Sequence, residues 1–463
     1  MKKSVLLLLF VSCFLNFYGQ TSSVTPPLPP APAADESDTA TIKHVEDAFA
    51  WGDFTWLNGN DRRHYNALAS KYFTGSVLLD VNYTNSFSHP IDHTVVGSST
   101  LARDNEMQVN FAGFGGDFNY KNARGRLMLQ FGTRATVVPR NDFSTTRGQF
   151  DLANAYRYFS EAYCGHHWDK WNGVNLDAGI FMSYIGLFSY YGAENWAYQP
   201  SFTSDNTPWF FNGARLQMFP NTKLKVEVWF INGWQSYAKF NEMPGIGGSV
   251  MWRPKEWFSL VSNNYYGADT QDKPGRVRVH SDNSIQVRYY NRPGAKGINR
   301  LSFSLTSDVG FEDGGGVTAF GGGGFNGSGG PPQNFASGMI YNRAMIGKHF
   351  GWTVGGGFMH NPGRYLVLLP TGDAGPAGTH PFTANPGDQF DGWDISTTFD
   401  WMPSQSETFR LEFVHREASV PYFAGPGGVT SPDGYTTTPL PVGWTPDLQK
   451  TETRIILAFL VRF

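Results

Sequence analysis

Hydrophobic and polar positions alternate with a period of two along most of the chain. Val77, Leu79 and Val81 share one side of the segment 76–85, while Asp80 and Asn82 share the other. Successive side chains of a β-strand point to opposite faces, so the pattern predicts a strand with one apolar and one polar face. The same alternation recurs at 126–134, 174–180, 223–230, 300–306 and 393–401.

The pattern predicts an all-β protein, a transmembrane antiparallel β-barrel of about 16 strands. Short connections alternate with long ones, which is typical of outer-membrane barrels with tight periplasmic turns, long external loops and both termini in the periplasm. Segment 49–57 is a candidate for one further strand. We place the strands at 76–85, 105–115, 126–137, 151–163, 173–185, 210–219, 222–232, 245–253, 256–266, 276–290, 299–310, 336–346, 351–360, 392–402, 407–416 and 452–463.

The choice of a membrane barrel over a soluble sandwich depends on the connections and the composition. Charged residues make up only 16% of the chain and aromatic residues also 16%, yet the mean hydropathy is −0.34. A barrel explains this combination, because lipid-facing and lumen-facing residues cancel in the mean. No run of about 18 apolar residues follows Gln20, which argues against helical spans and leaves a closed barrel as the spanning structure.

The N-terminus predicts export. Residues 1–20 have the features of a signal peptide, with Lys2 and Lys3 before a short apolar stretch. Residues 21–48 form a Pro-rich periplasmic segment, and 49–463 form the barrel. Without the two lysines, 34 basic and 39 acidic side chains remain, a net charge of about −5 that argues against nucleic acid as a partner. Cys164 then has no disulfide partner in the mature chain.

The last strand carries the most specific local signal. Phe459, Val461 and Phe463 alternate with other residues up to a terminal phenylalanine. This ending resembles the C-terminal signal by which outer-membrane proteins are recognised for insertion, so we expect the barrel-assembly machinery to be a partner. The alternative is an ordinary edge strand that ends in Phe.

Several longer stretches resemble one family, the OmpL-like putative β-barrel porins. The resemblance runs from about Phe49 to the C-terminus and implies a porin in the outer membrane. The family has no well-defined catalytic residues to carry over, and it does not identify the solute. The stretches are GDFTWLNGN (52–60), DAGIFMSYIGLFSYY (177–191), NWAYQPSF (195–202), NTPWFFNG (206–213), INGWQSY (231–237) and NPGRYLVLLP (361–370).

The alternation also selects residues for the lumen. An Arg or Lys that faces lipid at mid-membrane costs about 2–4 kcal/mol, so charged strand residues should point inward. The inward set holds 8 basic and 4 acidic residues, which predicts a mixed-charge pore with a weak preference for anions. The pore-lining candidates are Arg126, Arg134, Lys223, Lys225, Glu227, Arg288, Arg300, Asp394, Asp400, Arg410, Glu412 and Arg454.

The external loop between Ile185 and Phe210 is unusually rich in aromatic residues. A solvated loop gains nothing from them, and each ring buries about 150–250 Å² when it is packed. We therefore predict that the loop folds into the lumen and narrows the pore. Packing against a neighbouring subunit is the alternative, since both arrangements bury the same rings. The constriction candidates are Tyr190, Tyr191, Glu194, Trp196, Tyr198 and Asp205.

Two clusters have residue types used in catalysis or metal binding. CGHHWD (164–169) contains residue types that bind soft metal ions, but no second cluster supplies the remaining ligands. We therefore expect a solvated turn without a metal ion. His280, Ser281 and Asp282 are adjacent in an extended chain and point to opposite faces, which excludes a triad among them. The Gly-rich run 314–330 lacks the Lys-Ser/Thr of a phosphate loop and reads as an external loop. We expect no cofactor and no enzymatic activity.

The sequence thus predicts a bacterial outer-membrane porin with a water-filled pore for passive diffusion of small polar solutes or ions. Its expected partners are outer-membrane lipid, small polar solutes and further copies of itself in a homo-oligomer. A non-conducting structural or adhesive barrel is the alternative, and conductance distinguishes the two. A TonB-dependent transporter is disfavoured because the residues before the first strand are too few for a plug.

Overall fold

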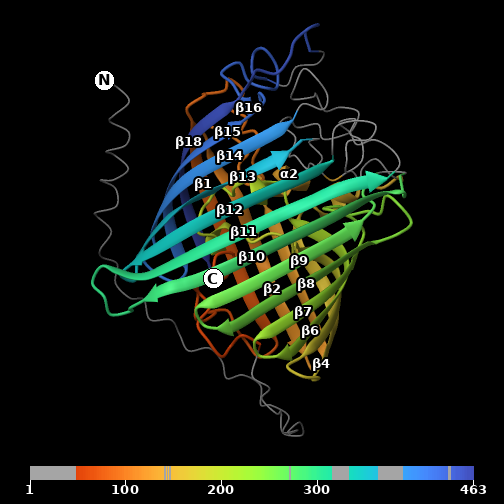
Figure 1. Cartoon of the computed structure of the whole chain (residues 1–463), viewed down its shortest axis with the longest axis vertical. Coiled ribbons are helices and arrows are strands. Elements are labelled where there is room, and N and C mark those ends of the chain that lie inside the picture. The colour runs from red at the N-terminus through yellow and green to blue at the C-terminus, as the bar shows by residue number, and fades with distance from the viewer. Residues whose placement is uncertain are drawn as a thin grey trace, which may run out of the picture. The chain divides into compact units, whose positions relative to one another are not determined.

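Sixteen antiparallel strands close into a barrel in the computed structural model, which describes residues 48–139, 142, 144, 148–270, 273–314, 333–362, 389–435 and 440–463. This confirms the predicted fold and strand number. Each wall strand pairs with the next one along the chain, β15 pairs with β18, and β18 pairs with β1 to close the wall (Figure 1). The wall strands are β1 (Phe73–Ser86), β2 (Met107–Tyr120), β3 (Ala123–Phe131), β4 (Phe159–Trp168), β5 (Val174–Met182), β6 (Phe210–Asn221), β7 (Leu224–Ile231), β8 (Gly245–Lys255), β9 (Phe258–Gly267), β10 (Arg276–Asn291), β11 (Ile298–Gly314), β12 (Asn334–Ile346), β13 (Phe350–Asn361), β14 (Phe390–Trp401), β15 (Glu407–Ala418) and β18 (Thr451–Arg462).

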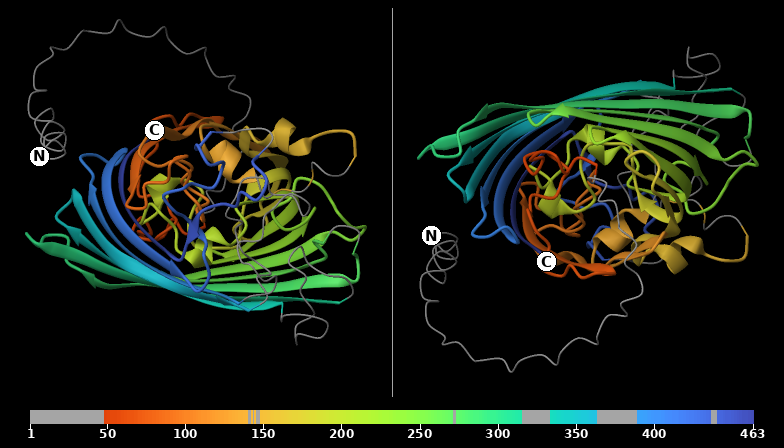
Figure 2. Two further views of the ribbon diagram at one scale, coloured as in Figure 1. Left: turned by 90° about the horizontal axis from the view of Figure 1, so that it is seen from above. Right: turned by 90° about the horizontal axis from the view of Figure 1, so that it is seen from below.

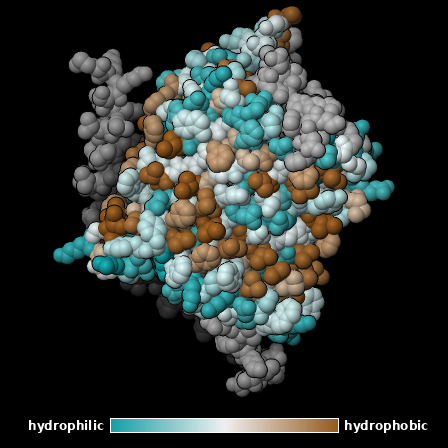
Figure 3. All heavy atoms as spheres, viewed as in Figure 1, coloured by the Kyte–Doolittle hydropathy of each residue, from teal (hydrophilic) through white to brown (hydrophobic). Residues whose placement is uncertain are grey.

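The alternation along each strand decides which side of the wall a residue faces. In β1, Asp80, Asn82 and Thr84 are buried inside the barrel, while Leu79 is 44% exposed on the outside. Hydrophobic side chains dominate the outer surface over β9 to β12, with hydrophilic ones among them (Figure 3). The wall therefore has the polar inner face and apolar outer face that a membrane barrel requires.

The two ends of the barrel have different connections. At one end, here called the short-turn end, the strands are joined by residues 121–122, 169–173, 222–223, 256–257, 292–297, 347–349 and 402–406. At the other, the long-loop end, connections such as 87–106, 183–209 and 419–450 are much longer. Strand β18 finishes at the short-turn end, beside the start of β1.

The region between residues 131 and 159 departs from the sequence prediction. The strand predicted at 126–137 ends at Phe131, because Gly132 has a φ of +110° that an extended strand does not adopt. The helix α2 (Arg134–Val137) follows instead. The strand predicted at 151–163 is also wrong in its first half, where Asp151 caps the helix α3 (Leu152–Tyr156) by accepting a hydrogen bond from the backbone N–H of Asn154. Strand β4 starts only at Phe159.

Short elements complete the part of the chain that the structure describes. The 3-10 helix η4 (Gly192–Glu194) and the helix α4 (Phe202–Asp205) lie in the connection 183–209. Strands β16 (Phe423–Ala424) and β17 (Leu448–Gln449) pair with each other in the connection 419–450. Within the described ranges, no helix is long and apolar enough to cross a membrane.

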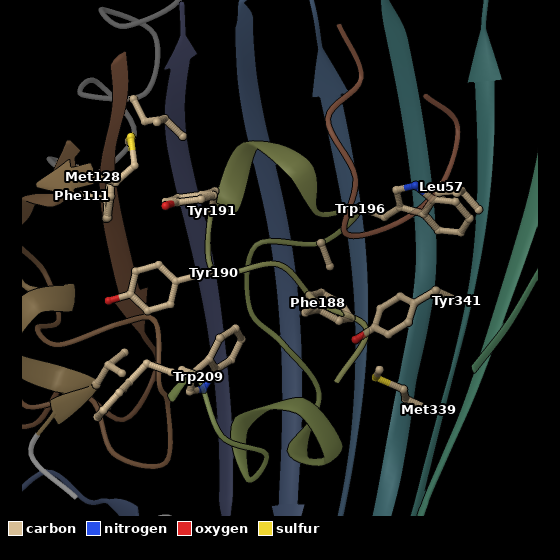
Figure 4. Close-up of a cluster of buried hydrophobic side chains, with 14 of the residues drawn as sticks. Leu57, Phe111, Met128, Phe188, Tyr190, Tyr191, Trp196, Trp209, Met339 and Tyr341 are labelled. Carbon is tan, nitrogen blue, oxygen red and sulfur yellow. The ribbon is translucent and has the colours of Figure 1, made fainter. Parts of the chain in front are cut away.

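The main hydrophobic cluster includes residues from opposite walls and from chain segments inside the barrel. The two end-on views show such segments within the ring of strands (Figure 2). Phe111 of β2 lies 6.1 Å from Tyr190, and Tyr341 of β12 lies 5.3 Å from Phe188, measured between ring centroids. In the close-up, Tyr190 and Phe188 lie between these two parts of the wall (Figure 4). The connection 183–209 therefore crosses the lumen.

Residues 49–57 form turns and no strand, so they do not add a seventeenth member to the wall. Phe54, Trp56 and Leu57 are buried in the same cluster as the connection 183–209. The indole N–H of Trp56 donates to the carbonyl of Glu256 in the β8–β9 turn, at 2.8 Å. This segment therefore lies against the short-turn end of the barrel.

Candidate functional site

Ten of the twelve residues proposed to line the pore lie on the inner face of wall strands. Their neighbours at alternate positions, such as Ser302 beside Arg300 and Thr398 beside Asp400, are buried inside the barrel. The ten are Arg126, Lys225, Glu227, Arg288, Arg300, Asp394, Asp400, Arg410, Glu412 and Arg454.

For the other two residues, Arg134 and Lys223, the prediction of a position on a wall strand is wrong. Arg134 begins helix α2 and is not part of the wall. Its guanidinium lies 4.3 Å from the ring centroid of Tyr190 and 4.7 Å from that of Trp209. Lys223 lies in the two-residue turn between β6 and β7, with its ammonium 4.6 Å from the ring centroid of Trp51. Both positions continue the alternation of a strand beyond its end: β3 stops at Phe131, before Arg134, and β7 starts at Leu224, just after Lys223.

Several of the inward charges form ion pairs within the wall. Arg343 and Arg410 both contact Asp400, each at 2.7 Å. Lys225 lies 2.9 Å from Glu227 on the same strand. Arg126 of β3 likewise lies between Asp117 of β2 and Glu161 of β4, at 2.6 and 2.8 Å. Asp117, Glu161 and Arg343 were not among the sequence candidates, although the alternation extended over the full strands would have placed them inside.

The connection 183–209 is held inside the lumen by four carboxylates of the wall and by its own two acids. We call residues 183–209 the inner loop. Glu412 of β15 accepts the backbone N–H groups of Tyr198 and Gln199, at 2.6 and 2.8 Å. Asp394 of β14 accepts the Ser201 hydroxyl and the backbone N–H of Phe202, at 2.8 and 2.9 Å.

A third wall carboxylate, Asp80 of β1, binds the inner loop through a phenol. Tyr198 donates its hydroxyl to Asp80 at 2.6 Å and accepts the side-chain amides of Asn82 and Asn110. Burial raises the pKa of Tyr198, with the charge of Asp80 acting in the same direction, so the phenol remains a hydrogen-bond donor. The ring is 1% exposed, which leaves no room for water beside it.

Each of the two acids of the inner loop is paired with an arginine of the wall. Asp205 lies 3.0 Å from Arg416 of β15, and it also accepts the backbone and hydroxyl of Ser99. Burial raises the pKa of Asp205, and the charge of Arg416 opposes that rise. Glu194 contacts Arg462 of β18 in an ion pair.

The other constriction candidates are also packed against the wall or the segment before it. Tyr190 donates to the side-chain carbonyl of Gln130 at 2.7 Å, and burial raises its pKa to about 12. Tyr191 donates to Glu161 at 2.7 Å. The backbone N–H of Trp196 donates to Asn58 at 2.7 Å.

The segment 48–72 closes part of the lumen and was not identified as functional from the sequence. Asn58 donates its backbone N–H to Gln286 of β10 at 2.8 Å, and Gly59 donates to the carbonyl of Glu194 at 3.1 Å. Its signal was available, because Phe49, Trp51, Phe54, Trp56 and Leu57 give it the same aromatic and apolar density that indicated the inner loop.

A cavity of about 180 Å³ remains at the short-turn end, between segment 48–72, the inner loop and strands β11, β12, β14 and β15. We call it the basic cavity. Five cationic side chains and two carboxylates line it, together with neutral polar residues. The charged members are Arg62, Arg300, Arg343, Lys348, Arg410, Glu194 and Asp400.

The two sequence clusters with catalytic or metal-binding residue types do not form such sites. CGHHWD is mostly strand and not a turn, so Cys164 and His166 are exposed while His167 faces inward and contacts Asn175 at 2.7 Å. His280 and Asp282 are buried inside β10, and Ser281 between them faces outward. Within the described residues, no group of three His, Cys, Asp or Glu is placed to hold a metal. The Gly-rich run from 315 on and the NPGRYLVLLP stretch from 363 on lie outside the described residues.

Comparison with known proteins gives one family. A model of the family described as putative beta-barrel porin-2, OmpL-like, matches residues 72–440. Among solved structures, outer-membrane expressed OmpT of Vibrio cholerae aligns over 86% of this chain and 99% of its own, with 7% identity and a TM-score of 0.48. The outer membrane channel DcaP of Acinetobacter baumannii aligns over 85% and 96%, with 10% identity and a TM-score of 0.46. An anion-selective porin from Comamonas acidovorans aligns over 84% and 99%, with 10% identity and a TM-score of 0.46. None of the curated proteins compared with the chain matches it.

Proposed function

Because the chain belongs to the OmpL-like β-barrel porin family, whose model matches residues 72–440, we propose that it passes small polar solutes or ions by passive diffusion. The bacterial outer membrane is its location. One observation carries the proposal: polar and charged side chains such as Asp80, Ser304 and Thr398 line the inside of a closed wall. A barrel that only filled space in the membrane would gain nothing from a polar lumen, whose desolvation costs free energy.

The inner loop sets the size of the passage in this proposal. It is bound to β1, β14 and β15 through Tyr198, Ser201 and Glu412, so it is a fixed part of the lumen. Solutes would pass between the inner loop and the wall, where ion pairs and amide side chains supply hydrogen bonds. We further propose that the barrel has no enzymatic activity, since Ser281 faces away from His280 and Asp282.

The alternative of a non-conducting barrel is supported by a specific observation. Many inward side chains, among them Asn110, Asp177 and Glu412, are less than 1% exposed. The inner loop and segment 48–72 cover much of the lumen in this conformation. A structural or adhesive barrel would show this packing permanently, whereas a pore requires a continuous wet passage.

Single-channel recording in planar bilayers distinguishes the two functions. We expect discrete conductance steps from the purified barrel, and larger steps after deletion of residues 191–206 of the inner loop. Folding of the deletion variant is checked by its shifted migration on unheated gels. A wild-type barrel that is silent at all voltages, and a deletion variant that is silent as well, would exclude the diffusion pore. Unchanged conductance with loss of oligomers would instead assign residues 191–206 to a subunit interface.

Four parts of the proposal concern export and assembly. We propose that residues 1–20 are a signal peptide, that 21–48 are a periplasmic segment, and that the barrel is formed by 49–463; residues 1–47 lie outside the described residues. We propose that the assembly machinery recognises β18. Phe459 stacks outside the wall on Phe409 at 4.4 Å between ring centroids, and Phe463 is 45% exposed just after the strand.

We also propose a homo-oligomer, with the contact on the outer face of β9 to β11. Asn264, Asn283 and Ser307 point outward and are exposed. Along β10, Asn283 lies between the outward residues Val279 and Ile285, and along β11, Ser307 lies between Leu305 and Val309. The polar side chains therefore lie within the apolar surface and not at its edge.

The strand register makes these side chains one continuous row. Asn283 pairs across the sheet with Ser307 on one side and with Ser262 on the other, and Ser281 pairs with Asn264. Polar groups without partners in hydrocarbon cost free energy, and within the described residues no hydrogen bond reaches the side chain of Asn264 or Ser307. Amides and hydroxyls both donate and accept, so the row is complementary to the same row on a second copy.

A further inference from the structure

The basic cavity has an excess of positive charge that its own carboxylates do not neutralise. Asp400 is fully occupied by Arg343 and Arg410, which it contacts through both of its oxygens at 2.7 Å. Glu194 is paired with Arg462, which is not part of the lining. Both acids of the cavity are therefore already paired, Asp400 with two arginines of the lining and Glu194 with an arginine outside it.

Three further cations of the lining have no carboxylate partner there. Arg62 donates to the carbonyl of Glu407 and the hydroxyl of Thr408, both uncharged acceptors, at 2.6 and 3.1 Å. Within the described residues, the side chains of Arg300 and of the exposed Lys348 form no hydrogen bond and no ion pair, although the charge of Asp53, which lies outside the lining, acts on Arg300. Arg62 comes from segment 48–72, Arg300 from β11 and Lys348 from the β12–β13 turn, so distant parts of the chain converge on one cavity.

The pKa of Arg62 agrees with the gathering of positive charges around the cavity. Burial lowers its pKa to about 10, and the nearby charges of Arg343 and Arg410 lower it further against the attraction of Asp400. Cations that repel one another in a partly buried site are stabilised by an anion between them. The planar guanidinium groups present paired N–H donors that match the oxygens of a carboxylate or phosphate.

We propose that the basic cavity is a binding site for a small soluble oxyanion, one that carries a carboxylate or phosphate group. Arg300 and Arg62 bind the anionic oxygens, and the neutral side chains of Asn60, Ser302 and Gln405 bind hydroxyl or carbonyl groups of the remainder. The volume of about 180 Å³ accommodates inorganic phosphate or a small organic acid, but not a polymer. This inference rests on the proposed diffusion function, because it names the class of solute that is retained on its way through the lumen.

Phosphate titration tests the site by two separate readouts. In planar bilayers with KCl, addition of inorganic phosphate should produce resolved interruptions of the current, and succinate should do the same. Calorimetric titration of the detergent-solubilised barrel with phosphate measures binding without conductance. Each of Arg300→Gln and Arg62→Gln should weaken phosphate binding by about tenfold or more, the effect expected for loss of one charge-assisted hydrogen-bond donor. Arg300→Lys should recover part of the affinity, since it restores the charge without the paired donors.

A matched control and the separate readouts make the outcomes distinct. Arg292→Gln removes a cation from a turn at the same end of the barrel but outside the cavity, and should bind phosphate like wild type. A conducting barrel that neither binds phosphate nor is interrupted by it overturns the oxyanion site and leaves the pore intact. A silent barrel that binds phosphate in an Arg300-dependent manner overturns the pore but supports the site. Equal weakening by Arg292→Gln and Arg300→Gln shows only general electrostatic attraction and rejects the site.

Discussion

Removing the Glu412 carboxylate should release the inner loop from the wall. Glu412 is 0% exposed and accepts three hydrogen bonds, two from the backbone of Tyr198 and Gln199 and one from the hydroxyl of Thr398 at 2.7 Å. No other acceptor is within reach of the two backbone N–H groups among the interactions of the described residues. In Glu412→Ala both groups therefore remain buried and unsatisfied as long as the inner loop keeps its position.

The magnitude follows from the number of donors that lose their acceptor. A buried donor left without a partner costs about 1–3 kcal/mol. Two donors on the inner loop thus disfavour its bound conformation by about 2–6 kcal/mol. Even the lower limit raises the ratio of displaced to bound inner loop about thirtyfold, since 1.4 kcal/mol corresponds to a factor of ten.

Two assays report the position of the inner loop. Chymotrypsin has sites at Tyr198, Phe202 and Trp209 that are buried in the wild-type barrel and should become cleavable in Glu412→Ala. Single-channel conductance should rise or fluctuate between levels. Glu412→Gln keeps one acceptor oxygen, so its chymotrypsin sensitivity and its conductance should lie between those of the wild type and those of Glu412→Ala. Glu417→Ala, on the same strand but facing outward, should behave like wild type.

A specific result would refute this reasoning. If Glu412→Ala forms a heat-modifiable barrel with wild-type conductance and wild-type resistance to chymotrypsin, the carboxylate does not hold the inner loop. The contacts at Asp80 and Asp394 would then have to hold the inner loop without Glu412.

Two further predictions concern the outer surface. Replacing Asn264 and Ser307 together by leucine should lower the oligomeric fraction on native gels without destabilising the barrel. The control Thr397→Val, elsewhere on the outer face, should leave the oligomeric fraction unchanged. An unchanged oligomer in the double variant, or a monomeric wild type, contradicts the proposed contact. Cys164, which is exposed on the outer face of β4, should react in lipid vesicles with an apolar maleimide but only slowly with a membrane-impermeant one, because a polar reagent does not enter the hydrocarbon that this face contacts. Ser404→Cys in the β14–β15 turn, made in a Cys164→Ser background, should react with both reagents. Rapid labelling of Cys164 by the impermeant reagent would mean that β4 faces water.

The strands could be predicted from the sequence because a membrane barrel imposes one rule on every position of the wall. Leu79 and Ile285 must suit lipid and Asp80 and Gln286 must suit a polar lumen, so the period of two is visible without any knowledge of tertiary contacts. The rule fails where the chain leaves the wall. At Arg134, the alternation continues by chance past Gly132, whose positive φ ends the strand.

The site could be predicted only in part, because alternation gives the face of a residue but not its partner. Arg126, Asp400 and Glu412 were placed on the inner side of the wall from the sequence. Which acid meets which base depends on the register between strands and on the segments that enter the lumen, as for Glu194 and Arg462, which are far apart in the chain. Patterns within a single strand contain no information on such pairs.

The seam between the first and last strands has a consequence for biosynthesis. Leu78 pairs with Arg462 and Ser86 with Arg454, so the partner of β1 is the wall strand farthest from it along the chain. Until β18 is in place, one edge of β1 remains unpaired, and such an edge is a template for aggregation. Closing so long a segment is entropically expensive, although each doubling of its length adds only about 0.6 kcal/mol. A nonsense mutation anywhere before β18 therefore leaves two open edges, and its product should be cleared by periplasmic proteases rather than accumulate as a smaller barrel.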